Sequence, residues 1–235
     1  MNSLWTDISQ RADIKLSDEQ HISLSRYLDL LLQANEKMNL TRITERAAAE
    51  LNHIADALTL LPFIPIGSLK VADVGSGGGV PGIPLAIARP DLQFTLIEST
   101  KKKAAFLRDT IHSLKLENVK VIDQRAEEVG HTDLRKTFDV VIARAVGQLI
   151  WIAEWCLPLA KKGGKVLAMK GAKVHEEIPP ALKAIHLLGG ADPIVHQVDL
   201  PGTEHHVIVE IKKIEKTDSR YPRNPTTTKG KPLSA

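Results

Sequence analysis

The fold is decided by the stretch Val71-Ala-Asp73-Val-Gly75-Ser-Gly77-Gly78-Gly79-Val80-Pro81-Gly82. A β-rich run over 70–74 leads into this cluster of glycines, and a helical pattern over 81–89 follows it. Glycines permit positive φ angles and let backbone amides approach a ligand, while Pro81 suits the first turn of a helix because its missing N–H needs no partner there. The stretch therefore predicts a ligand-binding turn after the first strand of an open parallel sheet.

Around this turn, short β-rich runs alternate with helical patterns from about residue 69 onward. This alternation predicts right-handed crossovers and an α/β fold, a mostly parallel twisted sheet with helices on both faces. The run Val140-Val-Ile-Ala143 is apolar at successive positions, as expected of a strand buried on both faces. Candidate strands near 194–198 and 206–211 flank Pro201-Gly202 and predict an antiparallel C-terminal edge hairpin. The other strand runs are 70–74, 93–98, 119–123, 138–143 and 165–169, and the helical patterns are 81–89, 101–116 and 146–159.

Two helical segments precede the first strand. Residues 18–37 have apolar side chains at helical spacing, with Ser17 as the expected N-cap and Gln20 three residues later. A second helical stretch spans about 44–61 and ends at Pro62. We therefore expect a helical N-terminal extension over 1–66 and a cofactor-binding domain over 67–212.

The C-terminal residues 213–235 are polar, rich in proline and basic, which predicts an exposed, flexible tail. From Lys212 onward there are seven basic residues against two acidic ones, a net charge of +5, whereas the whole chain carries only +3. The tail is open to two interpretations, a phosphate-binding arm or a solubilising end.

Composition excludes several classes of protein. Hydrophobic residues make up 43% and charged residues 25%, which are ordinary values for a folded globular protein. No apolar run reaches the roughly 18 residues that a membrane helix needs, and the N-terminus lacks the pattern of a signal peptide, so we expect a cytoplasmic protein. The single Cys156 cannot form an internal disulfide and lies among apolar residues, where core packing is expected.

The glycines alone leave the cofactor open. Gly77 to Gly82 also fits the G-x-G-x-x-G pattern of dinucleotide-binding folds, and Glu98, at the end of the second strand, suits a ribose hydroxyl in either case. A glycine turn that only packs a helix on a strand is a further alternative. Asp73 favours a cationic ligand such as a sulfonium compound, because an acid beside the turn would repel a pyrophosphate.

Over about residues 15–212 the chain resembles the bacterial small-subunit ribosomal RNA guanine-N7 methyltransferases known as RsmG or GidB. The resemblance implies a Rossmann-like class I methyltransferase, S-adenosylmethionine as cofactor, and methylation of N7 of a guanine in 16S rRNA, either free or in the small ribosomal subunit. From the residues themselves we expect no metal and no membrane partner, and of the possible oligomeric states a monomer is favoured. The segments that carry the resemblance are Asn35-Glu-Lys-Met-Asn39-Leu40-Thr41, His53-Ile-Ala-Asp56, Asp73 to Pro84, Phe106-Leu107-Arg108, Arg125-Ala126-Glu127-Glu128, Ile142-Ala-Arg144-Ala145 and Lys170-Gly171. Beyond them, Tyr221-Pro-Arg-Asn-Pro225 in the tail resembles the version found in many Gram-positive and related members.

By position, the resemblance implies a set of cofactor-binding residues. Glu98 would bind the ribose, and backbone amides of Ala126-Glu127 would contact the adenine. Structural alternatives stay open: Glu98 as a strand-end acid, Ala126-Glu127 as the start of a helix, and Arg144 in an ion pair. The expected cofactor-binding residues are Gly75, Gly77, Val80, Glu98, Ala126, Glu127 and Arg144.

The implied reaction needs no catalytic base. Guanine N7 already carries an in-plane lone pair, so alignment with the methyl group is the main requirement, and we expect no catalytic acid or base. Positive side chains are candidates for RNA contact, with a solvated helix end as the alternative for the lysines. The candidates are Lys101, Lys102, Arg144, Arg220 and Arg223.

Two departures from the family and two rival functions remain. Ala34 stands where many relatives have Trp, and His205 where Arg is expected before the last strand. Asn35, Asn39 and Thr41 either serve the RNA side or brace the N-terminal helices, and His53 and Asp56 are expected to be structural. The rivals are a nicotinamide-dependent oxidoreductase and a noncatalytic ribosome-assembly factor.

Overall fold

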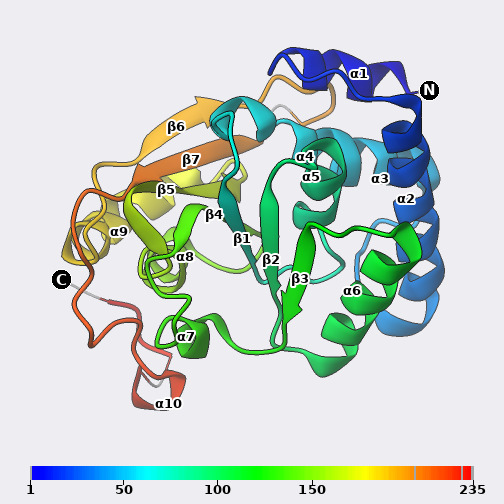
Figure 1. The fold of residues 1–235 in the computed structure, drawn as a ribbon. Coiled ribbons are helices and arrows are strands. Elements are labelled where there is room, and N and C mark those ends of the chain that lie inside the picture. The colour runs from blue at the N-terminus through cyan, green and yellow to red at the C-terminus, as the bar shows by residue number, and fades with distance from the viewer. Residues whose placement is uncertain (1, 204, 229, 234–235) are drawn as a thin grey trace. The chain divides into compact units, whose positions relative to one another are not determined.

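The computed structural model describes residues 2–203, 205–228 and 230–233 and contains a seven-stranded sheet in the order β3-β2-β1-β4-β5-β7-β6 (Figure 1). The pairs β1/β4, β2/β3 and β4/β5 are parallel, whereas β7 pairs antiparallel with both β5 and β6. The predicted α/β fold with an antiparallel C-terminal edge hairpin is confirmed. The strands are β1 (Lys70–Val74), β2 (Gln93–Ile97), β3 (Val119–Ile122), β4 (Phe138–Arg144), β5 (Ala160–Lys170), β6 (Ile194–Gln197) and β7 (Val207–Lys212).

The helices alternate with the strands of the parallel region, as predicted, and others precede β1. They are α1 (Ser3–Gln10), α2 (Asp18–Met38), α3 (Arg46–Ala49), α4 (Asp56–Leu58), α5 (Gly82–Ala88), α6 (Lys101–Leu114), α7 (Ala126–Val129), α8 (Leu149–Cys156), α9 (Val174–Leu187) and α10 (Pro225–Thr228). The chain divides into two compact units. The first is Met1–Leu69 with Ser76–Asp123, and the second is Lys70–Gly75 with Gln124–Ala235.

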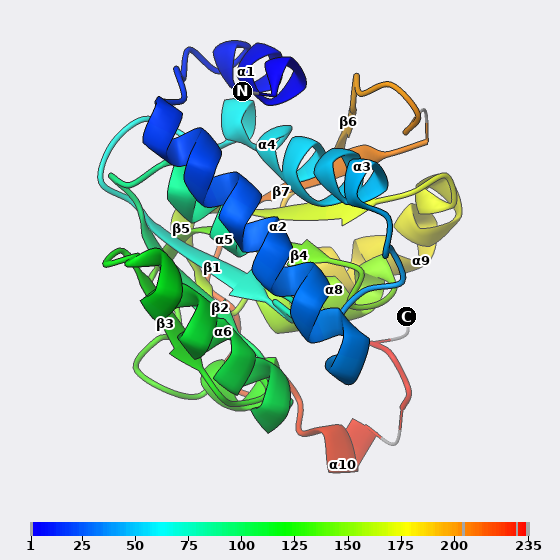
Figure 2. The ribbon, with the colours of Figure 1, turned by 90° about the vertical axis from the view of Figure 1, so that its right-hand side faces the viewer.

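In the first unit, α2 is the long helix that the sequence predicts over 18–37. Ser17 and Gln20 form a capping box, each side chain bonding to the backbone amide of the other. The apolar face of α2 packs against α5 and α6 (Figure 2). Leu24, Leu28 and Leu31 are buried there, so the periodic apolar residues form a core face, as the pattern indicates.

The second predicted helix, over 44–61, is interrupted. Between α3 and α4 the backbone forms a π-helical turn, Glu50–Ala55, and a 3₁₀ turn, Leu61–Phe63, follows. The Asn52 side-chain amide donates to the Ala48 carbonyl at 2.9 Å, and this is the acceptor that residue 52 would use through its backbone in an α-helix. This competition gives a local reason for the wider turn.

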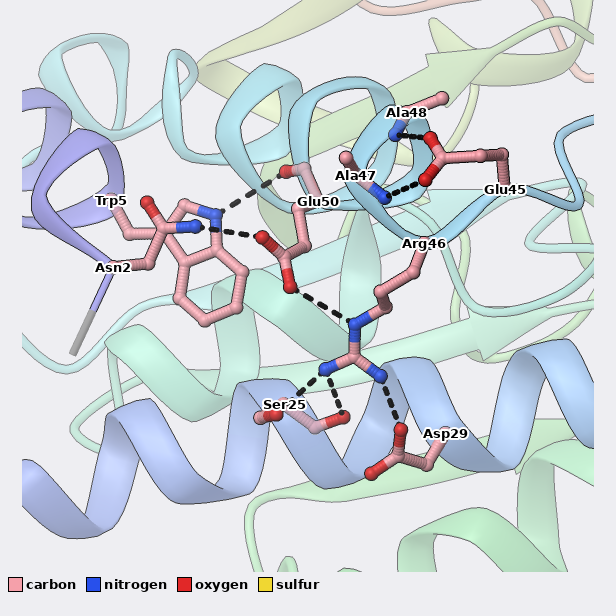
Figure 3. Close-up of polar contacts among 9 residues, drawn as sticks. All are labelled: Asn2, Trp5, Ser25, Asp29, Glu45, Arg46, Ala47, Ala48 and Glu50. Atoms are coloured by element: carbon pink, nitrogen blue, oxygen red, sulfur yellow. Dashed lines mark hydrogen bonds and ion pairs between the residues drawn. The ribbon is translucent and has the colours of Figure 1, made fainter.

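Polar contacts connect α1, α2 and this helical stretch (Figure 3). The Arg46 guanidinium donates to Glu50 at 3.0 Å and to the Ser25 hydroxyl at 2.7 Å, and it pairs with Asp29. Glu50 in turn accepts from the Asn2 side chain at 3.0 Å, which attaches the start of α1. The helical segments are thus joined by side chains from three parts of the sequence.

In the second unit, β1, β4, β5, β7 and β6 form the sheet and α8 packs against β4, β5 and α9 (Figure 1). Val140 to Ala143 are fully or almost fully buried, as predicted for this run. The sequence analysis did not predict α9, because Pro179 and Pro180 lie inside it. A proline within a helix removes a backbone donor, so its presence argues against a helix in most sequences.

The expectation of an exposed C-terminal tail is wrong for several residues. Lys213, Thr217, Pro222 and Leu233 are buried. Polar anchors account for the difference, because the Arg223 guanidinium pairs with the buried Glu154 at 2.7 Å. An apolar pattern does not report such contacts, which is why composition alone suggested exposure.

Candidate functional site

The part of the glycine turn that lies in the first unit requires residues without a Cβ. Gly77 and Gly79 have φ angles of 56° and 97°, and a Cβ at Gly79 would lie 2.5 Å from the Ile83 side chain. The Gly79 amide donates to the Ser76 carbonyl at 2.7 Å, which closes the turn before α5. The backbone therefore adopts a shape that glycine permits and other residues resist.

Glu98 lies at the end of β2 and meets this turn. Its side chain accepts the Gly77 amide at 2.9 Å through one oxygen and the Thr100 amide at 2.7 Å through the other. The residue is only 6% exposed. Two backbone donors fix the carboxylate, and because each oxygen has two lone pairs, it keeps acceptor capacity for ligand hydroxyls.

The N-terminal helices support the same turn, a role that the sequence analysis missed. The Tyr27 hydroxyl on α2 donates to the Gly78 carbonyl at 2.8 Å, and Tyr27 is fully buried. A Cβ at Gly78 would lie 2.7 Å from Leu31 Cδ1 and 3.5 Å from Leu40 Cβ. The only signal for Tyr27 was its place in the apolar stripe of α2, which does not reveal where the hydroxyl points.

The motif residues near Leu40 brace this support. Asn35 accepts the Thr41 amide at 2.8 Å, and the Thr41 hydroxyl lies 2.9 Å from His53 Nε2. Asn39 adopts the left-handed conformation that ends α2. Of the two interpretations left open for Asn35, Asn39 and Thr41, these contacts favour the structural one.

In the second unit, the carboxyl ends of β1 and β4 meet. Val74 is opposite Ala143 in the parallel register. Gly75 has a φ angle of 73°, and a Cβ there would lie 2.2 Å from Val146 Cγ1 in the turn after β4. The structure thus brings the predicted site residue Gly75 to the turn that follows Arg144.

Asp73 is buried, at 1% exposure, and lies in the core of this unit close to Cys156. Burial, and then the Asp73 carboxylate, raise the pKa of the Cys156 thiol. A buried thiol held in its neutral form is a poor nucleophile. Cys156 itself is completely buried in this core, which confirms its expected packing role.

Arg144 is the last residue of β4, and the turn after it is held by two side chains from elsewhere. Lys170 Nζ donates to the Gly147 carbonyl at 2.9 Å and pairs with Glu177 at 2.8 Å. Glu177 accepts the Leu149 amide at 2.6 Å at the start of α8. The sequence indicates Lys170 only as part of a family motif, whereas the structure shows that it contacts the turn after β4.

Ala126 and Glu127 form the first turn of the short helix α7, and both are buried. Arg125 precedes the helix, pairs with the Glu127 carboxylate at 3.0 Å, and its amide donates to Glu128 at 3.3 Å. The first two amides of a helix have no intrahelical acceptor, so a helix that begins at Ala126 and Glu127 is compatible with the predicted contact to adenine.

The candidate RNA-binding residues differ in exposure. Lys101 and Lys102 are exposed in the first turn of α6, and the Arg220 side chain is exposed and paired with Asp218 at 3.1 Å. Arg223 is half-buried, with 26% of its side chain exposed, and is bonded to Glu154. A phosphate can reach the first three side chains more readily than Arg223.

Two further searches cover only the part of the chain that the structure describes. Within it, no helix is long and apolar enough to cross a membrane. The same residues contain no cluster of three His, Cys, Asp or Glu side chains suited to a metal ion.

A glycine turn after β1, an acid after β2 and this strand order are typical of Rossmann-like S-adenosylmethionine-dependent methyltransferases. A SAM-dependent methyltransferase from Aquifex aeolicus has a similar fold, with a TM-score of 0.54 and 15% identity over 71% of this chain and 93% of that one. More particularly, the family model GidB, rRNA small subunit methyltransferase G, matches residues 20–207, and the chain belongs to this family.

Relatives support the assignment along most of the chain. The ribosomal RNA small subunit methyltransferase G of Lactobacillus delbrueckii subsp. bulgaricus is 40% identical, with 98% of each chain covered. The protein of the same name from Chloroflexus aggregans is 43% identical over 89% of each chain. The predicted family, the methyltransferase activity and the methyl donor are thereby confirmed.

Proposed function

We propose that this chain transfers the methyl group of S-adenosylmethionine to N7 of a guanine in 16S ribosomal RNA. The observation that carries the proposal is the family match over residues 20–207. The contact between Gly77 and Glu98 supports it, because it joins the glycine turn to an acid suited to ribose hydroxyls. The proposed setting is the cytoplasm, and the proposed working form is a monomer.

We assign the methyl donor to the residues that the sequence predicts. Glu98 would accept hydroxyls of the ribose, and the amides of Ala126 and Glu127 would bond to the adenine. Arg144 would orient the donor or the substrate, since an arginine stays charged and cannot act as a base. The proposed donor-binding set is Gly75, Gly77, Val80, Glu98, Ala126, Glu127 and Arg144.

The reaction asks for alignment rather than proton transfer. A bond forms between guanine N7 and the methyl carbon while the sulfur–methyl bond breaks, and the electron pair of that bond stays on sulfur. Sulfur loses its positive charge and the guanine gains one. The protein's contribution is therefore to hold guanine N7, the methyl carbon and the sulfur in line, and to exclude other orientations of the guanine.

For the RNA we propose contacts from Lys101, Lys102, Arg144 and Arg220, and not from Arg223, whose guanidinium is bonded to the buried Glu154. The exposure of the two lysines and of Arg220 supports a role in phosphate binding, because charge neutralisation dominates affinity for nucleic acid. Their removal should weaken binding more at low salt than at high salt.

The test is methyl transfer from tritiated donor to stripped 16S rRNA and to intact small subunits, with the labelled base mapped. We expect label at N7 of one guanine, and the better substrate of the two identifies the physiological form. Incorporation into neither substrate would contradict the proposal and favour a noncatalytic assembly factor. Protection against thermal unfolding by NAD but not by S-adenosylhomocysteine would favour the oxidoreductase.

A variant tests the donor site itself. Glu98→Gln should raise the KM for the donor about ten-fold or more, because a charged hydrogen-bond partner is lost. The exposed Glu117→Gln is the matched control and should leave the KM unchanged. An unchanged KM in Glu98→Gln would remove Glu98 from the site.

A further inference from the structure

The C-terminal segment 217–224, which we call the strap, is attached to the residues that follow α7. This segment contains the Tyr221-Pro-Arg-Asn motif, to which the proposed activity gives no role beyond RNA contact. Figure 1 shows the chain before α10 passing beside α7. Three separate contacts hold the strap, two of them with residues that follow α7 and the third with α8.

The first contact is a cluster of hydrogen bonds from Arg135. Its guanidinium donates to the carbonyls of Thr217 at 3.0 Å, Asp218 at 2.9 Å and Tyr221 at 2.5 Å. It also donates to the Gly130 carbonyl at 2.8 Å. One planar side chain thus connects the end of α7 to three carbonyls of the strap, a geometry that a lysine cannot reproduce.

The second contact is the close approach of Pro222 to Gly130. A Cβ at Gly130 would lie 2.6 Å from both Cγ and Cδ of Pro222. The ring nitrogen Nε2 of His131 lies 2.7 Å from the Pro222 carbonyl. Gly130 has an ordinary helical φ of −62°, so its lack of a side chain serves this packing rather than the backbone conformation.

The third contact attaches the strap to α8. The Glu154 carboxylate, 2% exposed, accepts the Arg223 backbone amide at 2.9 Å and two guanidinium nitrogens at 2.7 Å each. Bidentate pairing of this kind is strong and directional. It also satisfies a buried carboxylate that would otherwise be destabilising.

The residues contacted lie directly after α7, a helix of four residues. A single helical turn is not stable alone and needs tertiary contacts to hold its place. The Gly130 amide donates to the Ala126 carbonyl at 2.9 Å. Contacts that restrain the backbone at Gly130 therefore also restrain the backbone at Ala126. The strap therefore acts on the helix that begins with Ala126 and Glu127.

We infer that the strap is a positioning element for the donor site, and that Arg135 and Arg223 are positioning residues that hold Ala126 and Glu127 in place. This inference rests on the proposed function, since it takes these two amides as contacts to the adenine. It gives the tail a role in donor binding through α7, whereas an RNA-binding arm would act on the other substrate.

The experiment compares full-length Arg135→Met, Arg135→Lys and Arg223→Met with Lys216→Met. Lys216 is exposed in the same basic segment, so its replacement removes one charge from the tail without touching the strap contacts described above. For each protein one measures the affinity for S-adenosylhomocysteine by calorimetry, the KM for donor and for RNA, and hydrogen exchange of amides 126–131.

We expect the strap variants to raise the donor KM and the dissociation constant of S-adenosylhomocysteine about ten-fold. Substitutions along a chain of contacts typically change affinity at a connected site by factors of this order. Exchange at 126–131 should accelerate, the KM for RNA should change less than two-fold, and Lys216→Met should match the parent. Arg135→Lys keeps the positive charge but loses the planar set of guanidinium donors. If Arg135→Met fails to fold, Arg135→Lys should still raise the donor KM.

Two results would overturn the inference. One is faster exchange at 126–131 with unchanged affinity for S-adenosylhomocysteine, which would make the strap merely structural. The other is a raised KM for RNA with an unchanged donor KM, which would make the tail an RNA arm. Failure of the proposed function is separate, because it would appear as absent methyl transfer by the parent protein.

Discussion

Helix α2 and the C-terminal residues from 213 onward lie on either side of the strand-and-helix region in sequence, and different side chains anchor them. Helix α2 buries Tyr27, Leu28 and Leu31 completely or almost so, and a single hydroxyl reaches the glycine turn. The C-terminal segment is anchored instead by basic side chains with oxygen partners, among them Lys213 and Arg223. The first arrangement gains free energy from apolar burial, which is not directional, whereas the second depends on exact partners.

The two segments also contain a buried base each. His21 on α2 lies against Trp5, with ring centroids 6.0 Å apart, and Lys213 Nζ donates to the Leu188 carbonyl at 2.5 Å. Burial lowers the pKa of both groups. Because their ordinary pKa values are far apart, the two segments should respond to different ranges of pH.

The largest expected effect on the free energy of unfolding concerns α2, the segment anchored by apolar burial. Tyr27→Ala should lower the free energy of unfolding by about 3–5 kcal/mol, since it removes a fully buried aromatic ring and leaves a cavity. Ile22→Ala, at an exposed position of the same helix, should change it by less than about 0.5 kcal/mol. Urea denaturation of both variants measures the difference.

A milder variant separates packing from hydrogen bonding at the same position. Tyr27→Phe keeps the ring and removes the bond to the Gly78 carbonyl, so about 1–2 kcal/mol should be lost. If Tyr27→Phe were as damaging as Tyr27→Ala, apolar packing would not be what anchors α2, and the contrast with the C-terminal segment would fail.

The second prediction concerns Lys213, which is 1% exposed. Burial, and then the positive charges of Arg135 and Lys136, lower its pKa to about 7. Between pH 7 and its ordinary value near 10.4, the unfolded chain binds a proton that the folded chain lacks, so stability rises with pH. Relative to Lys213→Met, the parent should gain about 1 kcal/mol per pH unit from pH 7 to 9.

Paired urea denaturation curves at pH 7, 8 and 9 measure this gain. The comparison with Lys213→Met removes the contribution of other groups that titrate in the same range. Parallel pH dependence in the two proteins would show that Lys213 keeps its proton in the fold, and the polar anchor would then be an ion rather than a neutral amine.

The contrast between the segments also explains what the sequence could predict. The periodic leucines and the Ser17 cap predicted α2, and the apolar run at Val140 predicted a buried central strand, because both patterns follow from the geometry of one element. Glu98 was predicted through its place after a strand. In the structure it contacts the Gly77 amide, 21 residues away in sequence.

The missed features share a physical cause. Arg135 contacts backbone carbonyls more than 80 residues away. Because every residue has a backbone carbonyl, no sequence pattern could reveal that contact with the strap. The π-helical turn at Glu50–Ala55 is accompanied by a side-chain bond from Asn52, which apolar periodicity does not report. Composition indicated a polar tail correctly, but polarity does not separate a solvated segment from one held by directional bonds.

The smallest expected effect is the acid response of the N-terminal segment. The pKa of His21 is lowered by burial, and the Asp18 carboxylate opposes this shift. As the pH falls below about 6.5, the unfolded chain takes up a proton before the folded chain does, so stability falls. His21→Gln lacks this group, and the difference in unfolding free energy between parent and variant should therefore shrink by about 1 kcal/mol or less from pH 7 to 5.

Urea denaturation of both proteins at pH 7 and pH 5 measures this difference, and hydrogen exchange of the α1 amides reports on the segment that His21 contacts. Because Thr6 lies 3.1 Å from His21 Nε2, the protection factors of α1 amides, corrected for the intrinsic pH dependence of exchange, should fall at pH 5 in the parent alone. An equal loss of protection in His21→Gln would assign the acid response to another group and leave Lys213 as the one titrating anchor in the comparison.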